Sequence, residues 1–329
     1  MASTDWIIDE APGRDVYAAI PDDFRLESGE ALAAGRIVGR LHGPERGPLV
    51  VVAGGISSGR FAARWWSWAV RAGGAIDLDR IRVLAFDLPP GRDEPGVTIT
   101  TADQARLLAL LLDALDEPGI DLFAGASYGG CVGLAFAAAF PERIGELVVI
   151  SAAHRSHPAA TAWRGVQRRL LAFARDCGRE AEGVALAREL AMTTYRTADE
   201  FGWRFAPTAP AQAGQPYPVC DYLIARGTDY AGQTSAARWI ALSDSLDRHT
   251  VAPEAVRCPL TVLGFTTDRL VPIEDLRELA VRAPNLRRLG EASSIFGHDA
   301  FLKERELVGR TLHDALSPLY ARVLNEIAA

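Results

Sequence analysis

The chain has 329 residues, of which 49% are hydrophobic and 23% are charged, and it carries a formal net charge of −7. This is the composition of an ordinary globular protein, and the acidic balance argues against nucleic acid as a partner. The length suits one large α/β domain that contains an inserted subdomain.

We expect no export signal, membrane span or metal site in this sequence. Its start, "MASTDWIIDEAPGRD", has early acids and no long apolar run, and the apolar run 131–140 is too short to cross a bilayer. Cys131, Cys177, Cys220 and Cys258 lack the spacing of metal ligands. We therefore expect a cytoplasmic protein with reduced thiols, no bound metal and no membrane partner.

Short β-branched runs alternate with helical patterns through the first half of the chain. The expected strands are 48–55, 80–89, 120–126 and 143–153, and the expected helices are 101–117 and 128–140. Alternation of this kind predicts an α/β fold with a mainly parallel sheet and helices on both of its faces.

This alternation stops at about residue 154, and only helical patterns follow as far as residue 255. Strand character returns at 259–268, followed by a helix at 273–283, a weak strand near 285–292 and a closing helix. We predict a core made of residues 1–153 and 256–329, with residues 154–255 forming a helical lid over the carboxyl edge of the sheet.

Ser127 stands where an expected strand changes into an expected helix, in "GASYGG". Small residues are needed where a backbone turns sharply or where two elements nearly touch. One interpretation is a tight strand-to-helix connection. The other is a nucleophile elbow of the G-x-S-x-G type, which exposes the serine hydroxyl above the sheet.

A nucleophilic serine needs a base and an acid, which follow it in the order Ser, acid, His in this kind of sheet. Of the six histidines, His298 lies in "SSIFGHDAF", in a loop just after the last expected strand. Asp268 lies at the carboxyl end of the preceding strand, in "TVLGFTTDRLVP". Each residue alone would also suit a helix cap, but their order favours a catalytic triad.

Two backbone N–H groups are needed to stabilise the oxyanion. The first is expected from Tyr128, the residue after the nucleophile. The second is expected from the glycine-rich loop "AGGISSGR", where Ile56 and Ser57 are the candidates. This loop is not a phosphate loop, because it lacks the GK[ST] ending.

With these residues the chain resembles the homoserine O-acyltransferases of the α/β-hydrolase superfamily, over about residues 47–303. The segments that carry the resemblance are "GGIS", "GASYGG", "ALARELAMTTYRT", "DYL", "TTDRLVP" and "GHDAFL". "GHDAFL" and the lid helix are more specific than the elbow, which all α/β-hydrolases share.

The resemblance implies an α/β-hydrolase fold with Ser127, Asp268 and His298 as the triad. It also implies that Arg188 binds the carboxylate of the amino-acid substrate, that Tyr195 is a further substrate-binding residue, and that Asp299 binds the ammonium group. Without the resemblance, Arg188 and Tyr195 are two turns apart on one helix and suit ordinary packing or solvated positions.

The reaction that the resemblance implies is ping-pong transfer of an acyl group from acyl-CoA to the hydroxyl of L-homoserine, in methionine biosynthesis. Acyl-CoA is then a co-substrate, and no cofactor is bound permanently. In the family, an arginine two positions after the triad aspartate is associated with succinyl use. This chain has Leu270 there, which slightly favours acetyl-CoA, although the compact subgroup that it resembles leaves succinyl-CoA open. A homodimer through the lid helices is compatible with the helical insertion.

The chain also departs from the family. It is shorter than the usual member, and "FDLPPGRDEPG" lacks a longer glycine- and serine-rich stretch, which leaves the acyl-CoA entrance undefined. Two alternatives stay open: a serine esterase with the same triad, and an O-acyltransferase that acts on L-serine or a secondary metabolite. A non-catalytic binding protein is disfavoured, because no triad member is missing.

Overall fold

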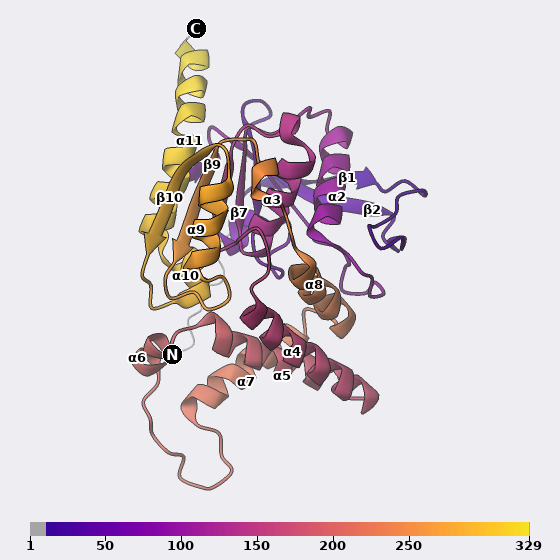
Figure 1. Cartoon of the computed structure of the whole chain (residues 1–329), viewed down its shortest axis with the longest axis vertical. Helices are drawn as coiled ribbons and strands as arrows, with labels where there is room; N and C mark the ends of the chain where they lie inside the picture. Colours follow the sequence, from indigo (N-terminus) through magenta and orange to yellow (C-terminus); the bar gives the residue numbers. More distant parts are fainter. Residues whose placement is uncertain (1–10, 329) are drawn as a thin grey trace.

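A computed structural model describes residues 11–328, and an eight-stranded sheet forms the centre of its core (Figure 1). The strand order is β1-β2-β6-β3-β7-β8-β9-β10. The strands are β1 (Gly13–Ala19), β2 (Arg36–His42), β3 (Leu49–Ala53), β6 (Arg82–Phe86), β7 (Leu122–Ala126), β8 (Leu147–Ile150), β9 (Leu260–Phe265) and β10 (Leu286–Ala292). From β6 to β10 the neighbours pair in parallel, which confirms the predicted mainly parallel sheet. A separate pair, β4 (Val70–Arg71) and β5 (Ile76–Asp77), is also parallel.

Helices cover both faces of the sheet, so the central strands are apolar throughout. Every residue of β3, β7, β8 and β9 is buried. One face packs against α2 (Thr101–Ala114), α3 (Tyr128–Ala139) and α9 (Ile273–Arg282). The other packs against α1 (Ala62–Trp65), α10 (Ala300–Lys303) and α11 (Arg305–Ala328). Alternate residues of β3 point into these two clusters, as the period of a strand requires.

The sequence patterns did not predict β1 and β2, which form an antiparallel extension at one edge of the sheet. In β1 only Val16 and Ala18 are buried, and four charged residues interrupt the two strands: Arg14, Asp15, Arg36 and Arg40. An edge strand that is half exposed therefore lacks the continuous apolar run that identified the central strands.

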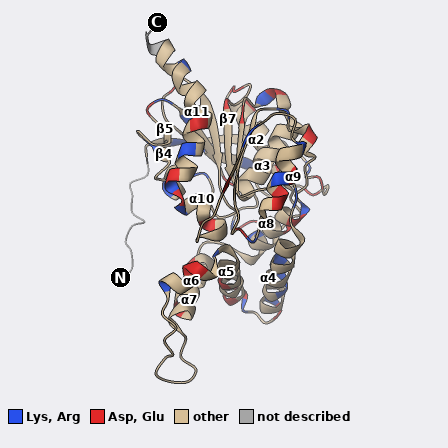
Figure 2. Cartoon of the chain, turned by 60° about the vertical axis from the view of Figure 1, so that its left-hand side comes forward, with Lys and Arg blue, Asp and Glu red and all other residues tan. Residues whose placement is uncertain are grey.

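The segment expected to be a lid is helical and lies at the carboxyl edge of the sheet, at the opposite end from the C-terminus (Figures 1 and 2). Its helices are α4 (Pro158–Asp176), α5 (Glu180–Tyr195), α6 (Ala198–Arg204), α7 (Pro218–Ala231) and α8 (Ala236–Arg248). Within this described stretch there is no strand, apart from a single antiparallel bridge between Arg155 and Thr250. The lid has a small core of its own, which includes Leu171, Val184 and Trp239.

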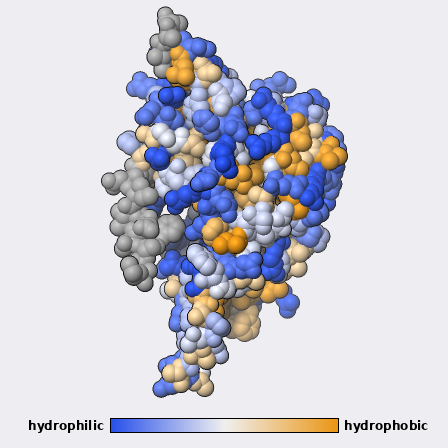
Figure 3. Space-filling model, turned by 90° about the vertical axis from the view of Figure 1, so that its left-hand side faces the viewer, coloured by the Kyte–Doolittle hydropathy of each residue, from blue (hydrophilic) through white to orange (hydrophobic). Residues whose placement is uncertain are grey.

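On the face shown in Figure 3, apolar residues occur in separate groups among hydrophilic ones. Within residues 11–328, no helix combines the length and the apolar character needed to cross a membrane.

Candidate active site

Ser127 occupies a strained turn between β7 and α3. Its backbone has φ 52° and ψ −123°, a conformation that non-glycine residues rarely adopt. Glycine is required on both sides of the turn: a Cβ on Gly125 would lie 2.5 Å from the carbonyl oxygen of Gly129, and one on Gly129 would lie 2.1 Å from that of Ala53. The turn therefore has the geometry of a nucleophile elbow.

The structure brings Ser127, His298 and Asp268 together at the carboxyl ends of parallel strands. Oγ of Ser127 lies 2.8 Å from Nε2 of His298, and Nδ1 of His298 lies 2.7 Å from Oδ2 of Asp268. The backbone N–H groups of Leu270 and Val271 donate to Oδ1 of Asp268. This carboxylate is therefore fixed, and it can hold the imidazole in the orientation that a base needs.

The electrostatics of His298 also suit a base. Burial alone lowers the pKa of His298, but the carboxylate of Asp268 outweighs burial and raises the pKa above its usual value. By contrast, burial lowers the pKa of His249 to about 4, and both nitrogens of that ring are engaged, by Thr101 and by the carbonyl of Ala153. His249 is therefore a neutral structural residue.

The expected oxyanion donors lie beside Ser127. Tyr128 is the first residue of α3, so its N–H has no acceptor within the helix. Ile56 and Ser57 line the cavity above the serine, and in the described chain neither of their N–H groups donates a hydrogen bond. Arg238 of α8 donates to the carbonyl of Ile56 at 3.3 Å and so helps to fix the loop.

A cavity of about 150 Å³ lies between the triad and the lid, and Arg188, Tyr195 and Asp299 all line it. The guanidinium of Arg188 lies 5.5 Å from the ring centre of Tyr195, and among residues 11–328 it pairs with no carboxylate. Burial raises the pKa of Asp299, and Arg196 opposes this rise with Nη2 placed 3.4 Å from Oδ2. A cation and an anion therefore face the same cavity as the triad.

The structure also places charged lid residues that the sequence reasoning missed. Arg164 of α4 lines the cavity, and Arg196 pairs with both Asp299 and the buried Glu200. Arg196 directly follows Tyr195 in "TTYRT", and this adjacency could have indicated that Arg196 lies near the site. For Arg164 no signal in the sequence distinguishes it from the other arginines of α4.

Leu270, the position associated with acyl choice, is buried and lines the cavity. The adjacent Arg269 is exposed, and its guanidinium stacks 4.9 Å from the ring centre of Trp163. The apolar side chain therefore faces the cavity, while its charged neighbour lies on the outside.

Comparisons with known proteins agree with this geometry. The alpha/beta hydrolase fold family matches residues 47–304. The chain is 42% identical to a homoserine O-succinyltransferase of Xanthomonas campestris pv. campestris, over 84% of this chain and 77% of that protein. It is 30% identical to a homoserine O-acetyltransferase of Clavibacter michiganensis subsp. michiganensis, over 87% of this chain and 88% of that protein.

Solved structures show the same fold at lower identity. A homoserine O-acetyltransferase from Staphylococcus aureus superposes with a TM-score of 0.80 at 21% identity, over 93% of this chain and 95% of that chain. Esterase E22 superposes with a TM-score of 0.84 at 14% identity, over 93% of this chain and 100% of that chain.

Proposed function

Because the chain belongs to the homoserine O-acyltransferases of the α/β-hydrolase fold, we propose that it moves an acyl group from acyl-CoA to the hydroxyl of L-homoserine. The observation that carries this proposal is one cavity lined by Ser127 and His298 of the hydrogen-bonded triad and also by Arg188 and Asp299. The triad suits acyl transfer, and the opposite charges of Arg188 and Asp299 suit the binding of a small zwitterion.

In the first half-reaction, His298 accepts the proton of Ser127 while Oγ attacks the thioester carbonyl. The oxyanion is stabilised by the N–H of Tyr128 and by the loop that contains Ile56 and Ser57. The carbon–sulfur bond then breaks, and the CoA thiolate leaves with the proton held by His298. Acyl-CoA is a co-substrate in this scheme, and no permanently bound cofactor takes part.

In the second half-reaction, Arg188 holds the carboxylate of homoserine and Asp299 holds its ammonium group. The substrate hydroxyl passes its proton to His298 and attacks the acyl carbon. The bond from that carbon to Oγ of Ser127 then breaks, and His298 returns the proton to Oγ. The ring of Tyr195 lies 6.0 Å from that of His298 and covers the catalytic base. A covered and largely apolar cavity limits the competing attack by water.

Two indications about the donor point in opposite directions. Leu270 cannot pair with a carboxylate, and it favours acetyl-CoA, as the sequence predicts. The relative with 42% identity is a homoserine O-succinyltransferase, which favours succinyl-CoA. Turnover with the two thioesters distinguishes these donors.

The alternative is a serine esterase, which the fold of esterase E22 also accommodates. Hydrolysis of a p-nitrophenyl ester, measured first without an acceptor and then with L-homoserine, separates the two functions. Stimulation by homoserine supports transfer, and stimulation by L-serine would instead support the related acceptor.

Mass spectrometry of the protein mixed with acetyl-CoA or succinyl-CoA is the direct test of the proposed mechanism. We expect a mass increase of one acyl group on Ser127, which L-homoserine removes faster than water does. If no acyl-enzyme forms and no O-acylhomoserine appears, the proposal is wrong.

The wider setting is part of the same proposal: methionine biosynthesis in the cytoplasm, by a homodimer that forms through the lid. Phe173 of α4 and Trp203 of α6 are 73% and 72% exposed, and such large apolar side chains suit a contact between copies. Sedimentation of the chain with both residues changed to serine tests the dimer.

A further inference from the structure

A second, smaller cavity adjoins the candidate active site. It has a volume of about 30 Å³. The two cavities share the side chains of Cys131, Arg164, Leu246, Leu270 and Val271. Cys131 lies one helical turn along α3 from Ser127, and its N–H donates to the carbonyl of Ser127 at 3.1 Å. The shared wall therefore begins beside the residue that would carry the acyl group.

This shared wall is apolar except for Arg164. Nε of Arg164 donates to Oδ1 of Asp247 at 2.7 Å, and Nη2 also donates to Ser156. Arg168 pairs with the same Asp247, at 2.7 Å. One carboxylate thus serves two guanidinium groups, which leaves this cluster with a net positive charge. Among the described residues, no hydrogen bond uses Nη1 of Arg164.

The charge of Arg164 affects the pKa values of two groups that line the candidate active-site cavity. Burial raises the pKa of the Cys131 thiol to about 12, and Arg164 opposes that rise. The same guanidinium opposes the rise in the pKa of His298. Both groups line the larger cavity, so the charge of Arg164 faces the space in which the acyl group would lie.

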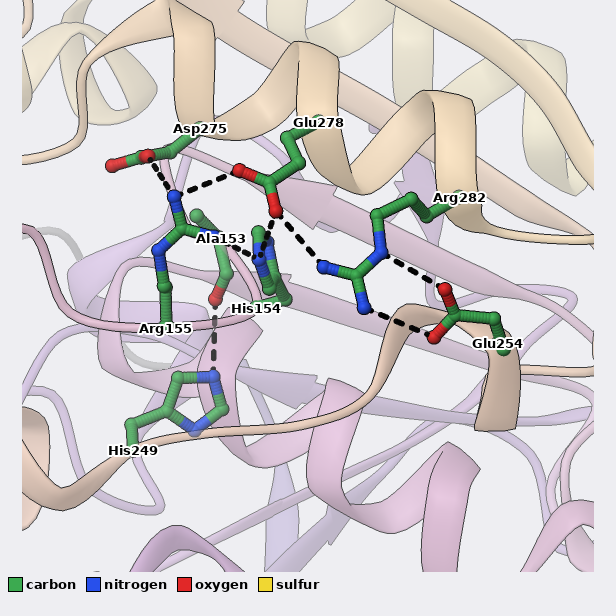
Figure 4. Close-up of polar contacts among 8 residues, drawn as sticks. All are labelled: Ala153, His154, Arg155, His249, Glu254, Asp275, Glu278 and Arg282. Atoms are coloured by element: carbon green, nitrogen blue, oxygen red, sulfur yellow. Dashed lines mark hydrogen bonds and ion pairs between the residues drawn. The ribbon is translucent and has the colours of Figure 1, made fainter.

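Arg155, the other arginine of the smaller cavity, is already neutralised. Figure 4 shows that its guanidinium lies between two carboxylates, those of Asp275 at 3.2 Å and Glu278 at 2.7 Å, and that it also contacts His154. Glu278 is shared in turn with Arg282. Arg155 therefore has two carboxylate partners, whereas Arg164 has one, which also pairs with Arg168.

We propose that Arg164 binds a carboxylate at the far end of the donor's acyl group, so that a dicarboxylic acyl thioester such as succinyl-CoA is the donor. The inference rests on the proposed acyl transfer through Ser127 and adds no step to it. The sequence-based expectation was that Leu270 favours acetyl-CoA. In this inference Leu270 is only part of the apolar cavity wall, and Arg164 of the lid helix α4 supplies the positive charge. Nη1 of Arg164 can donate a charge-assisted hydrogen bond to a carboxylate, whereas the methyl group of an acetyl donor accepts none.

The test measures kcat/KM for succinyl-CoA and for acetyl-CoA, with L-homoserine as the acceptor. We expect the wild-type chain to prefer succinyl-CoA, and Arg164→Gln to lower kcat/KM for that donor about 100-fold or more. Activity with acetyl-CoA should change by no more than about threefold, since the methyl group makes no ionic contact. Arg164→Lys keeps the charge without the planar fork, so it should retain part of the succinyl preference.

Arg169→Gln is the matched control, because Arg169 lies on the same helix as Arg164, is exposed and lines neither cavity. Its ratio of succinyl to acetyl activity should equal that of the wild type. Equal losses with both donors in Arg164→Gln, or a wild-type preference for acetyl-CoA, would overturn the inference while leaving the proposed function intact. Failure of both thioesters to acylate the wild-type Ser127 would instead overturn the proposed function and the inference together.

Discussion

The floor and the roof of the candidate site are built in different ways. The floor consists of Ser127, Asp268 and His298, which parallel strands and their loops place at one edge of the sheet. The roof consists of polar side chains on the lid helices, among them Arg164 and Arg188, which ion pairs and aromatic rings hold. Backbone geometry fixes the floor, whereas contacts between side chains fix the roof.

This difference assigns the chemistry to the floor and the choice of substrate to the roof. The fold that positions the floor recurs in esterase E22 at 14% identity, so the fold alone does not select an acceptor or a donor. Changes in the floor should therefore reduce every activity of the protein, whereas changes in the roof should affect one substrate and spare the other.

The largest effect is expected from the nucleophile. Ser127→Ala removes the only atom that can carry the acyl group in the proposed mechanism, so the transfer rate should fall about a million-fold. Intact-protein mass spectrometry should show no acyl adduct. Ser151→Ala is a suitable control, because Ser151 lines the same cavity and also has a positive φ, of 50°. The Ser151→Ala variant should still form the acyl adduct on Ser127. An acyl adduct on Ser127→Ala would place the nucleophile elsewhere.

The next largest effect concerns the acid of the triad. Asp268→Asn should slow acylation about 10⁴-fold, because the amide no longer orients His298 or stabilises its charged form. The pH profile gives a second readout. Acylation needs neutral His298, so the rate should fall as the pH drops through the pKa of His298, which Asp268 raises. In Asp268→Asn this pKa should decrease, and the acidic limb should move to lower pH. An unchanged limb would mean that another group titrates.

A roof residue should instead affect one substrate. Arg188→Ala removes the cation proposed to bind the carboxylate of homoserine, so the KM for homoserine should rise about 100-fold or more. The rate of acyl-enzyme formation should stay within about threefold of the wild-type rate, because the donor does not contact Arg188 in this scheme. Parallel losses in both half-reactions would show that Arg188 supports the lid as a whole.

The sequence predicted the floor well for a physical reason. Buried parallel strands are apolar throughout, as in β7 and β9, and the loops after them lie at one edge of the sheet. Chain order and strand ends were therefore enough to select Asp268 and His298. The structure brings both to Ser127, although their catalytic roles stay predictions.

The roof was much harder to predict, because a helical pattern does not show which face of a helix meets a cavity. Helix α4 carries four arginines, Arg164, Arg168, Arg169 and Arg175, and only the fold shows that Arg164 lines the cavity. The antiparallel strands β1 and β2 were missed for a related reason, since charged residues interrupt their apolar patterns. In both cases tertiary contacts, rather than local pattern, decide the environment of the side chain.

The smallest effect is expected where roof and floor meet, at Arg238 of α8. This lid residue donates to the carbonyls of Leu88, at 2.5 Å, and of Pro90. It also donates to the carbonyl of Ile56, in the loop that we propose supplies an oxyanion donor and here call the oxyanion loop. Arg238→Met keeps most of the apolar stem and removes the donors. The loop should then be held less firmly, and the acylation rate should fall about tenfold, because a small misplacement of a stabilising donor weakens transition-state binding.

The matched control for Arg238 is Arg248→Met, on the same helix. Arg248 is exposed and pairs only with Asp244 among the described residues, so both half-reactions should proceed at the wild-type rate. Single-turnover acylation, measured beside the KM for homoserine, tests the comparison. If Arg238→Met raised the KM alone, Arg238 would act only in the roof. A slower acylation with an unchanged KM would show that a lid helix positions the oxyanion loop, so that the roof supports the chemistry of the floor at this one contact.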